Sequence, residues 1–215
     1  KMAGNYENKY DGKVYNSGFK ENDGNLMLGV NKNWGHSYFN FSTYNSTLGI
    51  VEGERDADGN FTYVNRNGDD VTASDADYRG YKIGFPHQKI NHLRFTSNNY
   101  FLLKNGTINA DFAFQNNRRR EFGDATNPDD TELYFDLNTF NYNVRYNLKE
   151  SRNWETSFGI GGMQQSNTNK GLEALIPDYD FFDIGAFVYT QKKFSDKFTL
   201  AGGLRFDNRN VDSKE

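Results

Sequence analysis

The feature that most constrains this chain is an alternation of apolar and polar residues that persists over unusually long runs. In residues 197–210, Phe198, Leu200, Leu204 and Phe206 alternate with small or polar residues. A β-strand places alternate residues on opposite faces, so the pattern predicts long strands with one apolar face. The same reasoning predicts about nine strands, at 12–20, 25–33, 36–48, 88–103, 107–117, 132–147, 153–167, 181–193 and 197–210.

One of these predicted strands changes its apolar parity part of the way along. In 132–147 the apolar positions shift from Leu133 and Leu137 to Phe140 and Val144. A β-bulge near Asn138–Thr139 would produce this change. A continuous strand that passes from one environment into another would also produce it.

The predicted connections alternate in length. The short ones lie near residues 33–35, 104–106, 149–153 and 194–196, and the long ones cover 49–86, 118–131 and 168–180. In an antiparallel meander, all short turns then lie at one end and all long loops at the other. Seven Lys and Arg residues against two acidic residues surround the short turns, whereas the loop 49–86 has eight acidic and four basic residues. Aromatic residues such as Trp34, Tyr100 and Trp154 flank the short turns.

The composition agrees with a chain that has two different faces. Aromatic residues make up 16% of the 215 residues, although the mean hydropathy is only −0.90. No run of 18 apolar residues is present, which excludes a membrane-spanning helix. Long alternating strands, segregated loops and aromatic belts are typical of an outer-membrane β-barrel, because lipid cannot satisfy unpaired backbone groups. A soluble antiparallel β-sandwich is the less favoured alternative, since its strands are usually shorter.

Other functional classes are excluded by what the sequence lacks. The absence of cysteine rules out disulfides, thiolate metal sites and cysteine nucleophiles. A net charge of −4 argues against a nucleic-acid partner. Asp56–Asn60 looks like a calcium loop, but Phe61 and Asn67 occupy the positions that need Gly and Glu. We therefore expect a tight hairpin turn between 52–54 and 61–64.

We expect neither a metal site nor an enzyme. The three histidines, His36, His87 and His92, share no short spacing. No nucleophile motif, phosphate-binding glycine loop or plausible pair of catalytic carboxylates is present. The sequence therefore predicts no catalytic residues, no metal and no cofactor.

The chain has the features of a segment of a larger barrel. Nine strands is an odd number, whereas single-chain bacterial barrels have even numbers. Residues 1–12 and 210–215 are polar and resemble parts of long loops. We therefore expect residues 1–215 to form a single β-barrel segment that is truncated at both ends.

Several motifs resemble those of TonB-dependent outer-membrane receptors. The runs Gln115–Phe122 (QNNRRREF), Gly159–Asn167 (GIGGMQQSN), Ile176–Phe187 (IPDYDFFDIGAF) and Gly202–Arg209 (GGLRFDNR) occur in the order expected for that family. The resemblance covers about residues 15–210. It implies about nine strands of a 22-stranded transmembrane barrel in the outer membrane of a Gram-negative bacterium. The plug domain and the TonB-binding segment of the family have no counterpart here, so this chain would be a central portion of a receptor.

The resemblance also implies partners and a transport function. These are outer-membrane lipid, the plug domain of the same receptor, the TonB complex, and a ferric siderophore or similar chelate taken up actively. The polar face of the strands would form the lumen and bond to the plug or the ligand through Asn109, Asp111, Gln115, Glu155, Arg205, Asp207 and Arg209. Arg118, with the two arginines after it and Glu121, could clamp an anionic chelate or form ordinary ion pairs.

Two rival functions stay open from the sequence. A passive porin-like barrel needs no plug domain, and a complete gene with an upstream plug would eliminate it. A soluble carbohydrate-binding β-sandwich would use exposed Trp34 and Trp154. Folding as a monomer in buffer without detergent would favour that sandwich.

Overall fold

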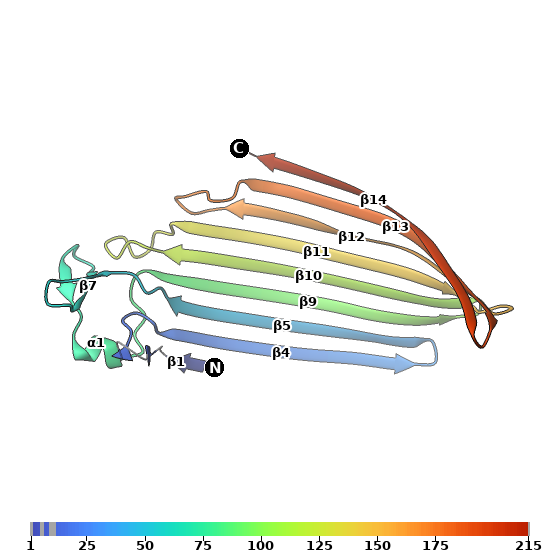
Figure 1. Ribbon diagram of the computed structural model, residues 1–215, viewed down its shortest axis with the longest axis horizontal. Coiled ribbons are helices and arrows are strands. Elements are labelled where there is room, and N and C mark those ends of the chain that lie inside the picture. The colour runs from blue at the N-terminus through green and yellow to red at the C-terminus, as the bar shows by residue number, and fades with distance from the viewer. Residues whose placement is uncertain (1, 5–6, 9–11, 215) are drawn as a thin grey trace.

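The computed structural model describes residues 2–4, 7–8 and 12–214, and shows one large antiparallel sheet (Figure 1). Its order is β1-β4-β5-β9-β10-β11-β12-β13-β14, so each long strand pairs with the next long strand along the chain. The eight long strands have 14 to 18 residues each. This confirms the predicted all-β, antiparallel meander of long strands.

The long strands are β4 (Phe19–Lys32), β5 (Gly35–Gly49), β9 (His87–Leu103), β10 (Gly106–Phe122), β11 (Leu133–Leu148), β12 (Trp154–Asn169), β13 (Asp178–Ser195) and β14 (Phe198–Lys214). β1 (Met2–Gly4) pairs with the start of β4, and β2 (Glu7–Asn8) pairs with β3 (Gly12–Lys13). Among the described strands, β14 pairs only with β13, so the sheet is open.

The ends of the sheet differ as expected. Figure 1 shows the four short turns at one end and the three long connections at the other. The longest connection folds into β6 (Glu54–Arg55), β7 (Phe61–Val64), β8 (Asp70–Thr72) and the short helix α1 (Asp75–Arg79). No helix in the described part of the chain is long and apolar enough to cross a bilayer.

Glycine is required where two of the short turns meet a neighbouring strand. Gly35 has φ of +130°, and a Cβ there would lie 1.9 Å from the carbonyl oxygen of Tyr100. Gly106 has φ of +155°, and its Cβ would lie 2.2 Å from the carbonyl oxygen of Asn147. Both positions therefore exclude side chains by conformation and by space.

The first predicted strand is wrong. Residues 12–20 do not form one strand. Residues 14–18 form a turn, and β4 begins at Phe19. Asn16 has φ of +52°, which a continuous strand does not allow. Parts of the expected N-terminal loop 1–12 lie outside the described residues. At the other end, β14 continues to Lys214, where a loop was expected.

The change of parity in β11 has an environmental origin. The register between β10 and β11 runs without a shift from Leu133 to Leu148, so no bulge interrupts it at Asn138–Thr139. Leu137 lies opposite Asn117, whereas Phe140 lies opposite Phe114 on the other face. The register shift lies instead in β13, between Lys193 and Ser195.

The two faces of the sheet have different chemistry. Residues opposite each other in an antiparallel pair project from the same face, and Phe114 lies opposite both Phe95 and Phe140. We call this side the apolar face and the other the polar face. The large exposed side chains of the apolar face include Leu26, Leu28, Phe39, Phe41, Phe95, Phe112, Phe114, Phe140, Phe158, Ile160, Ile184, Val188, Leu200, Leu204 and Phe206.

The apolar side chains do not form an interior. Leu204 is 79% exposed and Phe206 is 73% exposed, although both lie within a regular strand. Among the described residues the buried hydrophobic side chains are only Tyr15, Ala110, Phe122 and Ala125. Burying each large apolar side chain would contribute about 1.5–3 kcal/mol. No described part of the chain covers this apolar surface.

Candidate functional site

Eight of the nine predicted site residues share the polar face. The register places Asn109, Asp111, Gln115 and Glu121 of β10 on this side, together with Glu155 of β12 and with Arg205, Asp207 and Arg209 of β14. The two groups on β10 and β14 are four strands apart, which is roughly 19 Å at normal strand spacing. The structure therefore brings them to one surface but not into one cluster.

Arg118 is the exception. It lies opposite Asn91 of β9 and Asp136 of β11, and both partners belong to the apolar face. β10 continues to Phe122, so Arg118 lies within a strand rather than where a strand meets a loop. Its Nε lies 3.6 Å from Oδ1 of Asp136.

Side-chain hydrogen bonds between neighbouring strands connect the residues of the polar face. Asn98 donates to Asp111 at 2.8 Å, and Asn147 donates to Asn109 at 3.0 Å. Gln191 donates to Glu155 at 2.7 Å. These contacts orient carboxylate and amide groups across the sheet, where their free lone pairs can accept further bonds from a bound segment or solute.

The β14 group is organised by charge. Arg205 donates to Asp207 through Nε at 2.8 Å and through Nη2 at 2.6 Å. Arg209 donates to Asp183 of β13 at 3.3 Å. These exposed ion pairs place both positive and negative charges on the polar face.

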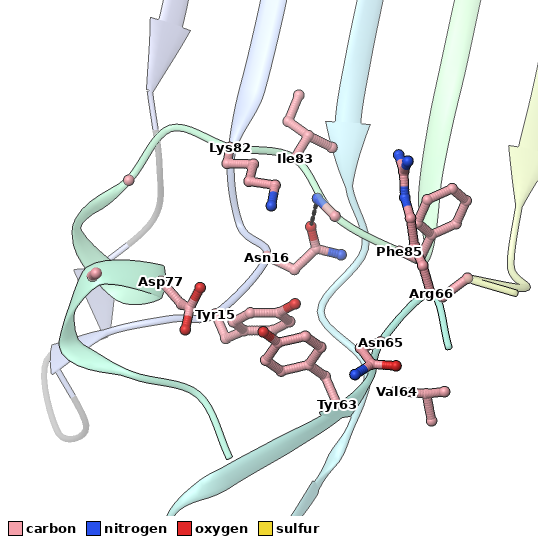
Figure 2. Close-up of a pocket in the computed structure, with 14 residues that line it drawn as sticks. Tyr15, Asn16, Tyr63, Val64, Asn65, Arg66, Asp77, Lys82, Ile83 and Phe85 are labelled. Atoms are coloured by element: carbon pink, nitrogen blue, oxygen red, sulfur yellow. Dashed lines mark hydrogen bonds between the residues drawn. The ribbon is translucent and has the colours of Figure 1, made fainter. Parts of the chain in front are cut away.

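The loop end has a cavity that the sequence did not indicate. It has a volume of about 270 Å³ and is lined by Tyr15, Tyr63, Asp77, Lys82 and Phe85 among others (Figure 2). The rings of Tyr15 and Tyr63 are stacked with centroids 4.5 Å apart. Burial, with Asp77 and the neighbouring phenol, raises the pKa of Tyr15 above its usual range. Tyr15, which also packs on Phe61 with centroids 5.1 Å apart, is buried, so the aromatic pair forms part of the wall of the cavity beside charged groups.

Asn16, which lines this cavity, forms hydrogen bonds with both ends of the loop 50–86. Its Nδ2 donates to the carbonyl oxygens of Ile50 at 2.8 Å and Pro86 at 2.7 Å. Its Oδ1 accepts from the backbone N–H of Gly84 at 2.8 Å, as the dashed line in Figure 2 shows. One buried amide thus satisfies three backbone groups far apart in sequence.

A second cavity adjoins the first. Its volume is about 630 Å³, and it shares Tyr63, Val64, Phe85 and Ala125 with the smaller one. Its acidic lining consists of Glu52, Glu54, Asp56, Asp70, Asp124 and Glu132. Burial and the nearby carboxylates of Glu173 and Glu121 raise the pKa of Glu132. The sequence showed the acidic character of this loop but not that it encloses a space.

The calcium-like stretch is a turn, as expected. Arg55 of β6 lies opposite Phe61 of β7, and Asp56 accepts from the backbone N–H groups of Asn60 at 2.8 Å and Asp58 at 3.0 Å. These hydrogen bonds lower the pKa of Asp56, and the bond from the Asn60 N–H has the largest effect. In the described part of the chain, no three His, Asp or Glu residues come together as metal ligands.

A pH-dependent element lies in the next loop. Asp124 accepts from the Thr126 hydroxyl at 2.6 Å, the Thr126 N–H at 2.7 Å and Asn127 at 2.7 Å. These bonds lower its pKa to about 2. Since the ordinary Asp pKa is about 3.9, this stabilisation is present at neutral pH and is lost as the pH falls through about 2. Carboxyl NMR titration should give a midpoint near 2 for Asp124, and an ordinary midpoint would contradict the turn.

The chain was compared with protein families, curated proteins and solved structures. No protein-family model and no curated protein matches the chain. Among solved structures, the chain is similar to the ferric yersiniabactin uptake receptor FyuA from Yersinia pestis, at 14% sequence identity and a TM-score of 0.48. That match covers 98% of this chain and 33% of the receptor chain, so the present chain spans about a third of that length.

Proposed function

We propose that this chain is a portion of a TonB-dependent outer-membrane receptor that takes up a ferric siderophore or a similar nutrient. The observation that carries the proposal is a sheet of eight long strands with one exposed apolar face and one polar face. In a bilayer, only strands closed into a barrel satisfy all backbone groups, with apolar residues outward and polar residues inward. Further strands of the receptor would pair with the free edge of β14.

The height of the apolar face supports a membrane setting. On β9 the apolar residues extend from Leu93 to Leu103, which is roughly 33 Å along a strand. With strands tilted by about 40°, this distance corresponds to about 25 Å along the membrane normal, the usual height of the apolar band of such barrels. Aromatic side chains lie where the apolar face meets the short turns. There the rings of Trp34 and Phe101 stack with centroids 5.5 Å apart.

The loop end supports a receptor more than a passive porin. The folded loop 50–86 encloses cavities with aromatic and charged linings, which suit capture of a ligand. Four motifs in the order of TonB-dependent receptors support the same choice. In this proposal the polar face contacts the plug domain, and the loop cavities contact the chelate. The chain would act by binding and not by catalysis.

Uptake measurements test the transport proposal. Under iron limitation, deletion of the gene that encodes this chain is expected to abolish accumulation of a labelled ferric chelate. Deletion of TonB should have the same effect, because the transport step needs relayed energy. Uptake that persists without TonB and rises linearly with chelate concentration would favour the passive porin instead.

Fractionation tests the membrane setting separately. The chain is expected in the outer-membrane fraction, resistant to alkaline carbonate and soluble only with detergent. A folded monomer in detergent-free buffer would contradict the barrel and favour the soluble β-sandwich.

A further inference from the structure

The two cavities at the loop end have opposite charge. We call the cavity of about 270 Å³ the small cavity and the cavity of about 630 Å³ the acidic cavity. The acidic cavity is lined by six carboxylates and by one cation, Arg55. The small cavity is lined by two cations, Arg66 and Lys82, and by one carboxylate, Asp77. Together they form an elongated site with a positive and a negative end, between the loop 50–86 and the connection after β10.

The two cavities meet at an apolar neck. Tyr63, Val64, Phe85 and Ala125 line both of them. The ring of Tyr63 is held in place by its stack on the buried ring of Tyr15, which Figure 2 shows. A group that bridges the two cavities therefore contacts rings and aliphatic carbon rather than charge, as a flat or apolar part of a ligand would.

The carboxylates of the acidic cavity repel one another and lack neutralising cations. Burial, followed by carboxylate charges that include Glu52 and Asp124, raises the pKa of Glu132. Among the ion pairs between described residues, none includes a carboxylate of this cavity. Arg55 donates to the carbonyl oxygen of Gly59 at 2.8 Å, within its own hairpin. A concave surface lined by one sign of charge concentrates solutes of the opposite sign.

The arrangement of these carboxylates suits an organic cation rather than a metal ion. A calcium ion needs about six to eight oxygens at about 2.3–2.6 Å, and no three acidic or histidine side chains of the described residues come together in this way. Asp56 and Asp124 also accept from backbone N–H groups of their own turns. An ammonium or guanidinium group has several donors on a long stem and can bond to carboxylates that lie further apart.

We propose that the two cavities bind a solute with an ammonium or guanidinium group, which lies in the acidic cavity. The inference rests on the proposed function and names the charge of its ligand. A flat or apolar part next to the cationic group packs against Tyr63 and Phe85 in the neck, and an anionic or oxygen-rich part points towards Arg66 and Lys82. The reverse orientation would place the cationic group against these two cations. The charges of the cavities therefore select the ligand and also orient it.

Binding of charge-matched chelates tests the proposal. The full chain is purified from outer membranes in nonionic detergent, and affinity is measured by titration calorimetry. The probes are a ferric trihydroxamate with a pendant aminoalkyl group, its N-acetyl form and its N-succinyl form, which differ mainly in the charge at that end. The aminoalkyl form is expected to bind at least tenfold more tightly than the N-acetyl form, and the N-succinyl form should bind most weakly.

Removal of the cavity charge should remove this preference. The combined variant Glu52→Gln, Glu54→Gln, Asp70→Asn leaves the carboxylates held in turns unchanged, and it is expected to bind the aminoalkyl and N-acetyl forms alike. Retained affinity for the N-acetyl form shows that the loops of the variant are folded. If that affinity is lost as well, the single variants decide, and an unchanged preference in all three would overturn the proposal.

A matched control removes the same charge elsewhere in the loops. The combined variant Asp58→Asn, Asp129→Asn, Asp130→Asn changes exposed carboxylates that do not line either cavity. It should keep the full preference for the aminoalkyl form. An equal loss of preference in this control would show that the overall charge of the loops acts, and would overturn the assignment to the acidic cavity.

The remaining outcomes separate this inference from the proposed function. Equal affinity of the unmodified chain for the three chelates would overturn the inference and leave the receptor proposal standing. Phenethylamine has a ring and an ammonium group but no iron; if it binds while no chelate does, the charge preference stands and the chelate is wrong. If neither phenethylamine nor any chelate binds, both proposals fail. Displacement of the aminoalkyl form by an equal concentration of calcium chloride would assign the acidic cavity to a metal ion instead.

Discussion

Phe112→Arg is expected to abolish assembly of the chain into the outer membrane, whereas Ala113→Arg is expected to be tolerated. Phe112 is on the apolar face, 36% exposed, and lies opposite Ser97 and Tyr142. A cationic residue at the bilayer midplane costs about 2–4 kcal/mol. Ala113, the next residue, projects from the polar face between Thr96 and Asn141, where a charge stays hydrated.

Heat-modifiable migration of the outer-membrane fraction in gels measures this difference. Phe112→Leu controls for loss of the aromatic ring and should assemble normally, because a leucine keeps the apolar contact with lipid. If Phe112→Arg and Ala113→Arg assemble equally well, the two faces do not meet different media, and the barrel proposal is wrong.

Asn16→Ala is expected to release the loop 50–86 while the sheet stays folded. The substitution leaves the carbonyl group of Ile50 and the N–H of Gly84 without the Asn16 amide, whereas the Pro86 carbonyl keeps the bond from the Ile50 N–H at 2.9 Å. Leaving a buried polar group unsatisfied costs about 1–3 kcal/mol each. The two cavities at the loop end should therefore lose their shape, and with it any ligand affinity.

Hydrogen exchange and limited proteolysis measure the release. The Gly84 amide should exchange at least tenfold faster, and cleavage should concentrate between residues 50 and 86. Asn25→Ala is the matched control, because Asn25 exchanges amide hydrogen bonds with Asn40 on the exposed surface of the sheet. Asn16→Asp keeps the acceptor for Gly84 but places a carboxylate oxygen against the carbonyl oxygens of Ile50 and Pro86, so it should also release the loop. Unchanged exchange in Asn16→Ala would show that the loop is held by other contacts.

The sheet was predictable from the sequence because its determinants are local. Alternation with a period of two is readable within a few residues, as in Phe198 to Phe206, and so are the short turns. The strand ends were less predictable. The sequence places Arg118 to Arg120 in the connection 118–131, although β10 continues through them to Phe122. A strand that leaves an apolar layer can have polar residues on both faces, so polarity alone does not mark its end.

The loop end was not predictable, because its determinants are distant in sequence. Asn16 bonds to residues 34 and 70 positions away, and nothing near it marks this role. A strand over 12–20 was therefore the natural prediction from alternation. The face of Arg118 was likewise undetermined, since one residue of uncertainty in register moves a side chain to the other side of the sheet.

The height of the apolar face determines which bilayer thickness it matches. A surface of about 25 Å matches a thin bilayer, whereas an average hydrocarbon thickness of about 30 Å would leave a mismatch of roughly 5 Å. Each ångström of mismatch costs a fraction of a kcal/mol. The apolar band on β9 does not extend further, because the polar side chains of Asn91 and Lys89 follow Leu93 on the same face. In the proposed membrane setting, thickness alone would favour the bacterial outer membrane, which is thinner than average.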